Sequence, residues 1–290
     1  MRYPQGVFRT TAAKLAGFAV ALGVLFGAAA LAGETVGPDR DGGGESDADA
    51  HGMSAEAREG GTDVVRGLAV SADGLSVALE RAELERGRPS ELRFRIEDAE
   101  GEAVRDFELE HDKRMHLIVV RRDGRGFQHL HPKLGSEGTW SVPVTLSEPG
   151  SYRVFADFKR GGEARTLAAD LSVDGAADYR PLPEPALTAG TGDGYEVRID
   201  ARRVRAGRDA ELAFHVTRDG REVETEPYLG ARGHLVALRE GDLAFLHVHP
   251  DENALAFLAE FPSAGRHRLY LQFKYEGRVH TAEFTQDVSR

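Results

Sequence analysis

The sequence predicts an all-β protein, with two tandem antiparallel β-sandwiches following an N-terminal hydrophobic export segment. Three observations lead to this fold class. Short runs of alternating apolar and polar residues recur from residue 65 onward, separated by Gly, Pro, Asp and Ser, which is typical of sandwiches. No stretch keeps a helical periodicity. One histidine-containing segment occurs twice at a constant spacing, which indicates an internal duplication.

The N-terminal residues 1–32 have the pattern of a signal peptide or an N-terminal membrane anchor. Arg2, Arg9 and Lys14 precede an uncharged apolar run that ends in the small-residue motif Ala30-Leu31-Ala32. The positive charge before the run predicts that the remaining chain lies outside the cytoplasm, either secreted or anchored. Membrane contact is then expected only through this segment. Residues 33–64 are acidic and Gly-rich, and we expect a disordered tether there.

Two sequence repeats follow the tether. The first covers residues 65–175 and the second residues 192–290, and a Pro-rich linker over 176–191 joins them. The expected strands of the first repeat lie in GLAVSADGLSVALE, ELRFRIED, DFELE, HLIVVRR, FQHLHP, TWSVPVTL, SYRVFADF and TLAADLSV. Those of the second lie in YEVRIDARRV, ELAFHVTRDG, HLVALRE, FLHVHP, FLAEFP, HRLYLQF and VHTAEFTQDV. At about 100 residues, each repeat is large enough to bury a core.

Composition narrows the classes of function. Acidic residues outnumber basic ones by 48 to 37, giving a net charge of −11. This excess argues against a nucleic-acid partner, because phosphate binding requires a basic surface. The chain contains no cysteine. Disulfides therefore do not hold the fold, and a metal site has to rely on nitrogen and oxygen ligands.

Residues 115–132, MHLIVVRRDGRGFQHLHP, have the pattern of a β-hairpin with Asp123-Gly124 at its turn. Counting back from the turn places His116 opposite His131. Because side chains alternate along a strand, His129 lies on the same face as both. Three imidazoles are thus predicted to converge on one patch.

The same arrangement recurs in residues 233–250, GHLVALREGDLAFLHVHP. His234, His247 and His249 repeat the first triplet at a constant offset of 118 positions (116 to 234, 129 to 247, 131 to 249). Three neutral nitrogens with an open fourth position suit Zn²⁺ or Cu²⁺. The sequence therefore predicts one metal-binding patch in each domain. The predicted ligands are His116, His129, His131, His234, His247 and His249.

Two other interpretations of these histidines stay open. Ile118, Val120 and Phe127 share the face of the first triplet, and that face is more apolar than an exposed metal site requires. The histidines can therefore serve the fold of a structural or protein-interaction module. An open three-histidine zinc site can also activate water for hydrolysis. No carboxylate matches in both copies and no catalytic motif occurs, so we expect no enzyme.

His111 and Met115 are weaker candidates. They belong only to the first copy, where Leu229 and Gly233 stand in the second. By strand alternation, both fall off the face of His116.

Two resemblances refine these predictions. The stretch PGSYRVFADF at 149–158 resembles the late strand of immunoglobulin-like and fibronectin-like sandwiches, with a Tyr near the corner. MHLIVVRR…FQHLHP, GHLVALR…FLHVHP and the YLGA stretch at 228–231 give the chain a resemblance to exported, two-copy bacterial proteins described as heavy-metal-binding. That resemblance implies metal sequestration, delivery or sensing in the cell envelope, with a metal ion and an envelope protein as partners. A more distant likeness is to periplasmic copper-resistance and YtkA-like sandwiches, whose Met-rich or amino-terminal His ligands this sequence lacks.

Overall fold

The computed structural model describes residues 66–201, 203–246 and 248–290. All of them fall within one compact unit, Gly60–Arg290. The expected export segment and tether lie outside the described residues. Within the described ranges, no helix is long and apolar enough to cross a membrane.

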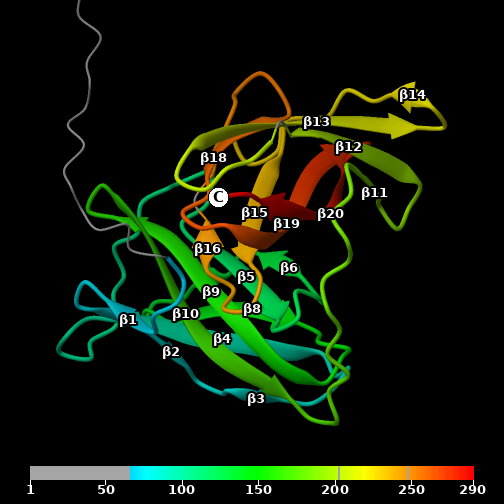
Figure 1. The fold of residues 1–290 in the computed structure, drawn as a ribbon. Helices are drawn as coiled ribbons and strands as arrows, with labels where there is room; N and C mark the ends of the chain where they lie inside the picture. The colour runs from blue at the N-terminus through cyan, green and yellow to red at the C-terminus, as the bar shows by residue number, and fades with distance from the viewer. Residues whose placement is uncertain (1–65, 202, 247) are drawn as a thin grey trace, which may run out of the picture. The chain divides into compact units, whose positions relative to one another are not determined.

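The first repeat is a sandwich of two five-stranded sheets (Figure 1). One sheet has the order β1-β2-β4-β8-β7, formed by Ser71–Ala72, Leu75–Leu79, Ser90–Glu97, Trp140–Val144 and Lys133–Leu134. The other has the order β3-β10-β9-β5-β6, formed by Glu83–Leu84, Glu163–Val173, Gly150–Arg160, His116–Arg121 and Gln128–Leu130. Pairing is antiparallel except between β3 and β10, which run parallel.

The second repeat has the same two-layer build. Its first sheet has the order β11-β12-β13-β18-β17, formed by Thr188–Gly190, Tyr195–Ala201, Asp209–Arg218, Ala256–Glu260 and Val248–Pro250, and β14 (Arg221–Glu222) pairs with β13. Its second sheet has the order β16-β15-β19-β20, formed by Phe245–Leu246, His234–Arg239, Gly265–Tyr275 and Arg278–Val288. The predicted fold class, two tandem immunoglobulin-like β-sandwiches, is confirmed.

Each sandwich buries its own core. In the first, Phe94, Trp140 and Val154 from both sheets form one buried cluster. In the second, Leu212, Leu235 and Leu271 belong to an equivalent cluster. Hydrophobic burial between the two inner faces is what holds such sandwiches together.

The start of β9 carries the corner that the sequence indicates. The hydroxyl of Tyr152 donates a hydrogen bond to the carbonyl oxygen of Glu148 at 2.8 Å. A tyrosine that bonds back to the chain a few residues upstream is a hallmark of immunoglobulin-like sandwiches. In the second repeat, His267 occupies the matching position of β19.

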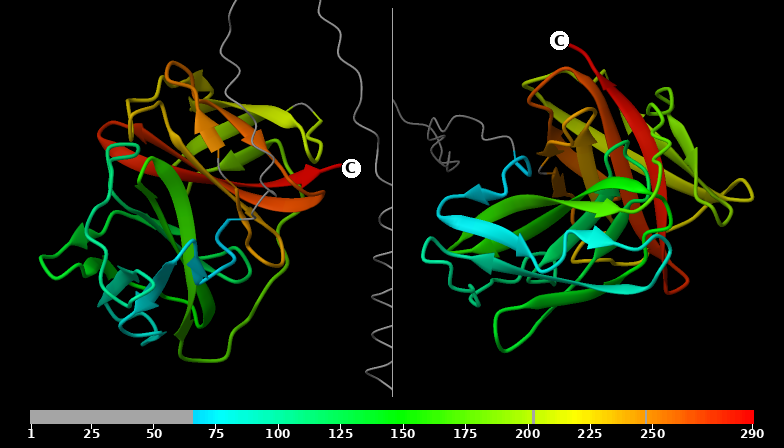
Figure 2. Two further views of the ribbon diagram at one scale, coloured as in Figure 1. Left: turned by 90° about the vertical axis from the view of Figure 1, so that its left-hand side faces the viewer. Right: turned by 90° about the horizontal axis from the view of Figure 1, so that it is seen from below.

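A third apolar cluster lies between the two repeats. It combines residues of β5, β9 and β10 with residues of β15, β16, β19 and the turn between β15 and β16, namely Ile118, Val120, Phe155, Ala168, Val236, Leu238, Leu243, Phe245 and Tyr270. All six residues of β5 are buried, because one face covers the first core and the other faces the second repeat. This junction explains the apolar face of the first histidine triplet. Figures 1 and 2 show the contributing sheets beside one another.

Candidate metal centre

The first histidine hairpin has the predicted register. Strands β5 and β6 pair Leu117 with Leu130 and Ile118 with His129, a register that continues to His116 opposite His131. The turn is closed by the amide of Gly124, which donates to the carbonyl oxygen of Arg121 at 2.8 Å. Gly124 has a φ of 76°, a left-handed backbone conformation that suits glycine.

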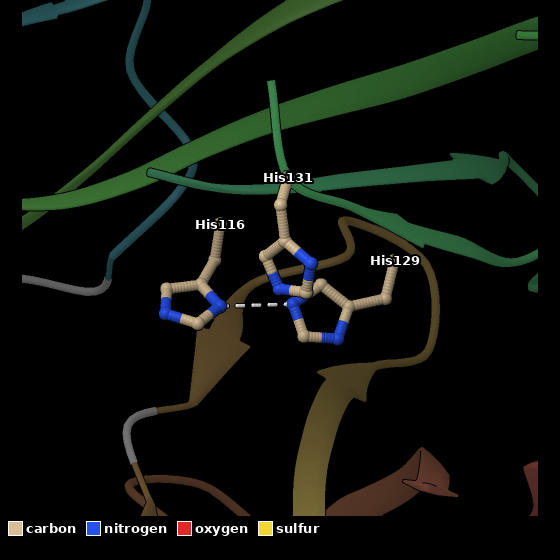
Figure 3. Close-up of side chains that lie close together, drawn as sticks. All are labelled: His116, His129 and His131. Carbon is tan, nitrogen blue, oxygen red and sulfur yellow. Dashed lines mark hydrogen bonds between the residues drawn. The ribbon is translucent and has the colours of Figure 1, made fainter. Parts of the chain in front are cut away.

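The three histidines of this hairpin converge (Figure 3). His116, His129 and His131 each offer one ring nitrogen, and these nitrogens lie within 4.8 Å of one another. His116 is only 2% exposed, and the other two rings are half-buried. The three rings converge as the hairpin pattern predicts, and metal binding by them stays a prediction.

His116 and His129 each make one hydrogen bond on the side of the ring that faces away from the cluster. These bonds bear on whether the other ring nitrogen carries a proton. The Nε2–H of His116 donates to the carbonyl oxygen of Glu110 at 3.0 Å. The Nδ1–H of His129 donates to Oε1 of Gln272 at 2.7 Å, while the amide nitrogen of Gln272 donates to Thr281 at 3.3 Å. With the outer N–H groups placed in this way, the inner nitrogens of both rings carry lone pairs. With the Gln272 amide turned round, the Nε2–H of His129 instead donates to Nδ1 of His116.

These two bare nitrogens, Nδ1 of His116 and Nε2 of His129, lie 3.0 Å apart. In the first arrangement two lone pairs face each other at this distance and repel unless a cation lies between or beside them. Two nitrogens bound to one tetrahedral zinc ion, at the usual bond lengths, lie roughly 3.3 Å apart. The observed spacing is close to that value.

Protonation of one ring does not supply the positive charge between these nitrogens at neutral pH. Burial lowers the pKa of His116 to about 4 and that of His131 to about 4. Burial, together with the neighbouring His116 and His131, lowers the pKa of His129 to about 3. At neutral pH all three rings are uncharged, which is the form that binds metals. Nε2 of His131 is also buried without a hydrogen-bond partner in the described residues.

His234 of the second repeat lies beside this triplet. Its ring is nearly parallel to that of His116, with centroids 5.3 Å apart, and its centroid is 4.6 Å from that of His129. Burial lowers its pKa well below the ordinary value. His234 was expected to form a separate patch, and it instead borders the first one.

The second triplet as a whole stays a prediction. His249 lies on β17, where it pairs with Leu258 of β18, and it is exposed. His247 lies outside the described residues. In the first repeat, β6 continues through Leu130 in the sheet of β5. In the second, β16 ends at Leu246 and the chain has joined the other sheet by Val248.

The two repeats also correspond in sequence to a known family. The DUF8832 domain, a domain of unknown function, matches residues 69–175 and again residues 189–290. The chain belongs to the DUF8832 family. Each match coincides with one sandwich, so each sandwich is one DUF8832 domain. No curated protein shows a significant match to the chain.

Several solved structures match this DUF8832 pair at low identity and with low TM-scores. The Escherichia coli adhesin FdeC is 15% identical with a TM-score of 0.27, and the match covers 77% of this chain and 66% of that one. A tetra-tandem repeat from the extending region of a large adhesion protein is 13% identical with a TM-score of 0.26, covering 74% and 49%. A chimeric titin Z1Z2 tandem is 13% identical with a TM-score of 0.20, covering 73% and 97%. The chain spans less than two thirds of FdeC and about half of the adhesion-protein repeat.

Sequence reasoning missed two polar residues on the strands beside the DUF8832 triplet. Gln272 directly follows the apolar run Leu269–Leu271 of strand β19, and its counterpart in β9 is Asp157, opposite His116. Each has a threonine neighbour, Thr281 or Thr166, and Thr166 donates to Asp157 at 2.7 Å. Burial raises the pKa of Asp157 to about 7. A polar side chain at the same position of β9 and β19 is the feature of the sequence that could have identified both residues.

His111 was also expected to lie away from the cluster. Its ring centroid is 6.1 Å from that of His116 and 6.0 Å from that of His234. The strand-alternation argument does not apply, because His111 lies in a turn with a φ of 47°.

Proposed function

We propose that this chain is a structural or protein-interaction module of the cell envelope, in which the histidine cluster serves the junction of two immunoglobulin-like repeats. The supporting observation is the position of the cluster. His129 bonds to Gln272 of the other repeat, and its ring lies against His234. The histidines thus contribute contacts on which the relative placement of the repeats depends.

We propose further that the cluster binds one divalent transition-metal ion, Zn²⁺ or Cu²⁺, through His116, His129 and His131. The observation behind this proposal is the pair of bare nitrogens 3.0 Å apart, together with the unpartnered nitrogen of His131. A histidine that binds a metal usually donates its other N–H to a carbonyl or carboxylate. His116 and His129 both have such an acceptor.

Burial favours a retained ion over rapid delivery. His116 is almost inaccessible, and an apolar cluster fills the junction beside it. Sequestration or a structural role in the envelope fits this setting better than transfer to a partner. Hydrolysis fits it less well, because within the described residues no carboxylate joins the group of nitrogens that can hold the ion.

Calorimetric titration of the metal-free full chain with Zn²⁺ at about pH 7.5 tests the metal proposal. We expect uptake, and a melting temperature that rises with Zn²⁺ because the ion binds the native state. His129→Ala with His131→Ala should abolish both effects. His215→Ala is the matched control, since His215 lies on β13 beside Asp200, outside the cluster, and should change neither.

If the histidines serve the junction without a metal ion, the expected result differs. In that case the double variant loses stability in the absence of metal, and Zn²⁺ changes nothing in either protein. Wild-type uptake no tighter than about 1 mM would refute metal binding. Uptake that persists in the double variant would refute these ligands.

A further inference from the structure

We infer that the metal site is shared between the two repeats, so that one ion per chain fastens the two sandwiches together. Three imidazoles of the first repeat hold the ion, Gln272 of the second repeat orients one of them, and His234 closes the fourth side. This inference rests on the proposed metal binding, and it replaces one site per domain with one site per junction.

The outer partners of the two best-defined ligands come from different repeats. The acceptor for His116 is the backbone of Glu110, six positions upstream in its own repeat. The acceptor for His129 is the side chain of Gln272, 143 positions away in the second repeat. The ring of His129 therefore has its ligand nitrogen aimed at the cluster only while the repeats are docked.

Gln272 is itself held in place. Its amide nitrogen bonds to Thr281 on the adjacent strand β20 at 3.3 Å, and its backbone position is paired with His234 of β15. One short segment of the second repeat thus brings both residues to the cluster. When the two repeats dock, Gln272 and His234 therefore reach the cluster at the same time.

His234 lies beside the cluster at the spacing of neighbouring imidazole rings. Two imidazoles on one tetrahedral ion have ring centres about 5 Å apart. The centroid of His234 is 5.3 Å from that of His116 and 4.6 Å from that of His129, and the pairs within the triplet range from 4.7 to 5.2 Å. The nitrogens that lie within 4.8 Å of one another belong to the first repeat alone, so His234 packs against the cluster as a neighbouring ring and is not one of its ligands in this geometry.

The junction around the site is well formed. The ring of Tyr270 stacks on that of Phe127 at 4.0 Å, and its hydroxyl donates to the carbonyl oxygen of Gly124 at 2.6 Å. Both contacts attach the second repeat to the hairpin that carries His129 and His131. Anything that stabilises this hairpin in place also stabilises the docked arrangement.

The test combines Zn²⁺ titration of the full chain with hydrogen–deuterium exchange of the junction strands. We expect one equivalent of Zn²⁺, slower exchange in β5 and β15 when it is bound, and 10- to 100-fold weaker binding in Gln272→Ala, about the usual effect of removing an outer partner. His234→Ala should weaken binding and remove the protection of β15. Gln286→Ala is the matched control, since its amide bonds only to the backbone of Asp287.

The outcomes separate the two proposals. No Zn²⁺ uptake by the wild type would refute both. Uptake of one equivalent that is unchanged in Gln272→Ala and His234→Ala, with no protection of β15, would overturn the shared site and leave metal binding by the first repeat intact. Uptake of two equivalents would overturn it as well. The exchange measurement on the wild type decides the question even if a variant fails to fold.

Discussion

At the residue scale, the hydrogen-bond acceptors on the outer side of His116 and His129 decide which nitrogen of each ring carries the proton. The carbonyl of Glu110 and the side chain of Gln272 take the outer N–H groups, which leaves the inner nitrogens as acceptors. The sequence could predict that the three rings lie together, because strand alternation places them on one face of the hairpin. It could not predict their protonation, because the partner of His129 lies in the other repeat.

His267 is a second residue whose environment decides its charge. It is fully buried at the position that Tyr152 occupies in the first repeat, and its Nε2 has no hydrogen-bond partner among the described residues. Burial lowers its pKa to about 4, while the unfolded chain titrates near the ordinary value of about 6.5. Below that value the unfolded state binds a proton that the folded state does not. Stability therefore falls as the pH drops from about 6.5 to about 4.

We predict that His267→Tyr, which introduces the corner residue of the first repeat, removes this part of the acid sensitivity. The dependence of the unfolding free energy on pH should decrease by up to about 1.4 kcal/mol per pH unit. Urea unfolding of the metal-free protein between pH 6.5 and 4 measures it. The reciprocal variant Tyr152→His should add a slope of the same sign. Equal slopes in the wild type and His267→Tyr would show that His267 is protonated in the folded state.

At the scale of elements, the β5–β6 hairpin could be predicted to its register. Its Asp-Gly turn fixes the pairing, and its strands are rich in β-branched residues. The second hairpin could not be predicted in the same way. Its sequence matches the first, but β16 ends at Leu246 in the sheet of β15, and Val248 pairs with Ala259 in the sheet of β18. That choice depends on competition between two sheets for one strand, which local sequence does not report.

The turn of the first hairpin gives a test of how it meets the second repeat. Gly124 has a φ of 76°, and a Cβ added there would lie 3.0 Å from Leu182 and 3.3 Å from the Tyr270 hydroxyl. We predict that Gly124→Ala costs about 1–2 kcal/mol for the backbone plus the cost of these contacts, measured by urea unfolding. Gly161→Ala is the control, since it has a φ of 61° and open space around it. An equal loss in both variants would show that the turn does not bear on the junction.

At the scale of the described unit, the two repeats pack through equivalent surfaces, as the subunits of a two-fold dimer do. Phe127 of the first repeat stacks on Tyr270 of the second. The equivalent pair, Phe245 of the second and Phe155 of the first, lies 5.5 Å apart. The duplication was visible in the sequence, but the packing of the copies against each other was not, because an apolar strand face does not identify its partner.

This junction predicts that the two repeats unfold together. Phe245 contacts Phe155 and belongs to the apolar cluster between the repeats, not to either core. Removing a buried phenylalanine ring costs about 3–5 kcal/mol, and here that cost falls on the contact between the repeats. We expect one calorimetric transition for the wild type and two separate transitions for Phe245→Ala. Leu258→Ala, an exposed position on β18, should keep the single transition. If Phe245→Ala also unfolds in one step, the repeats are coupled by something other than this cluster. If the wild type already unfolds in two, the junction contributes too little to couple them.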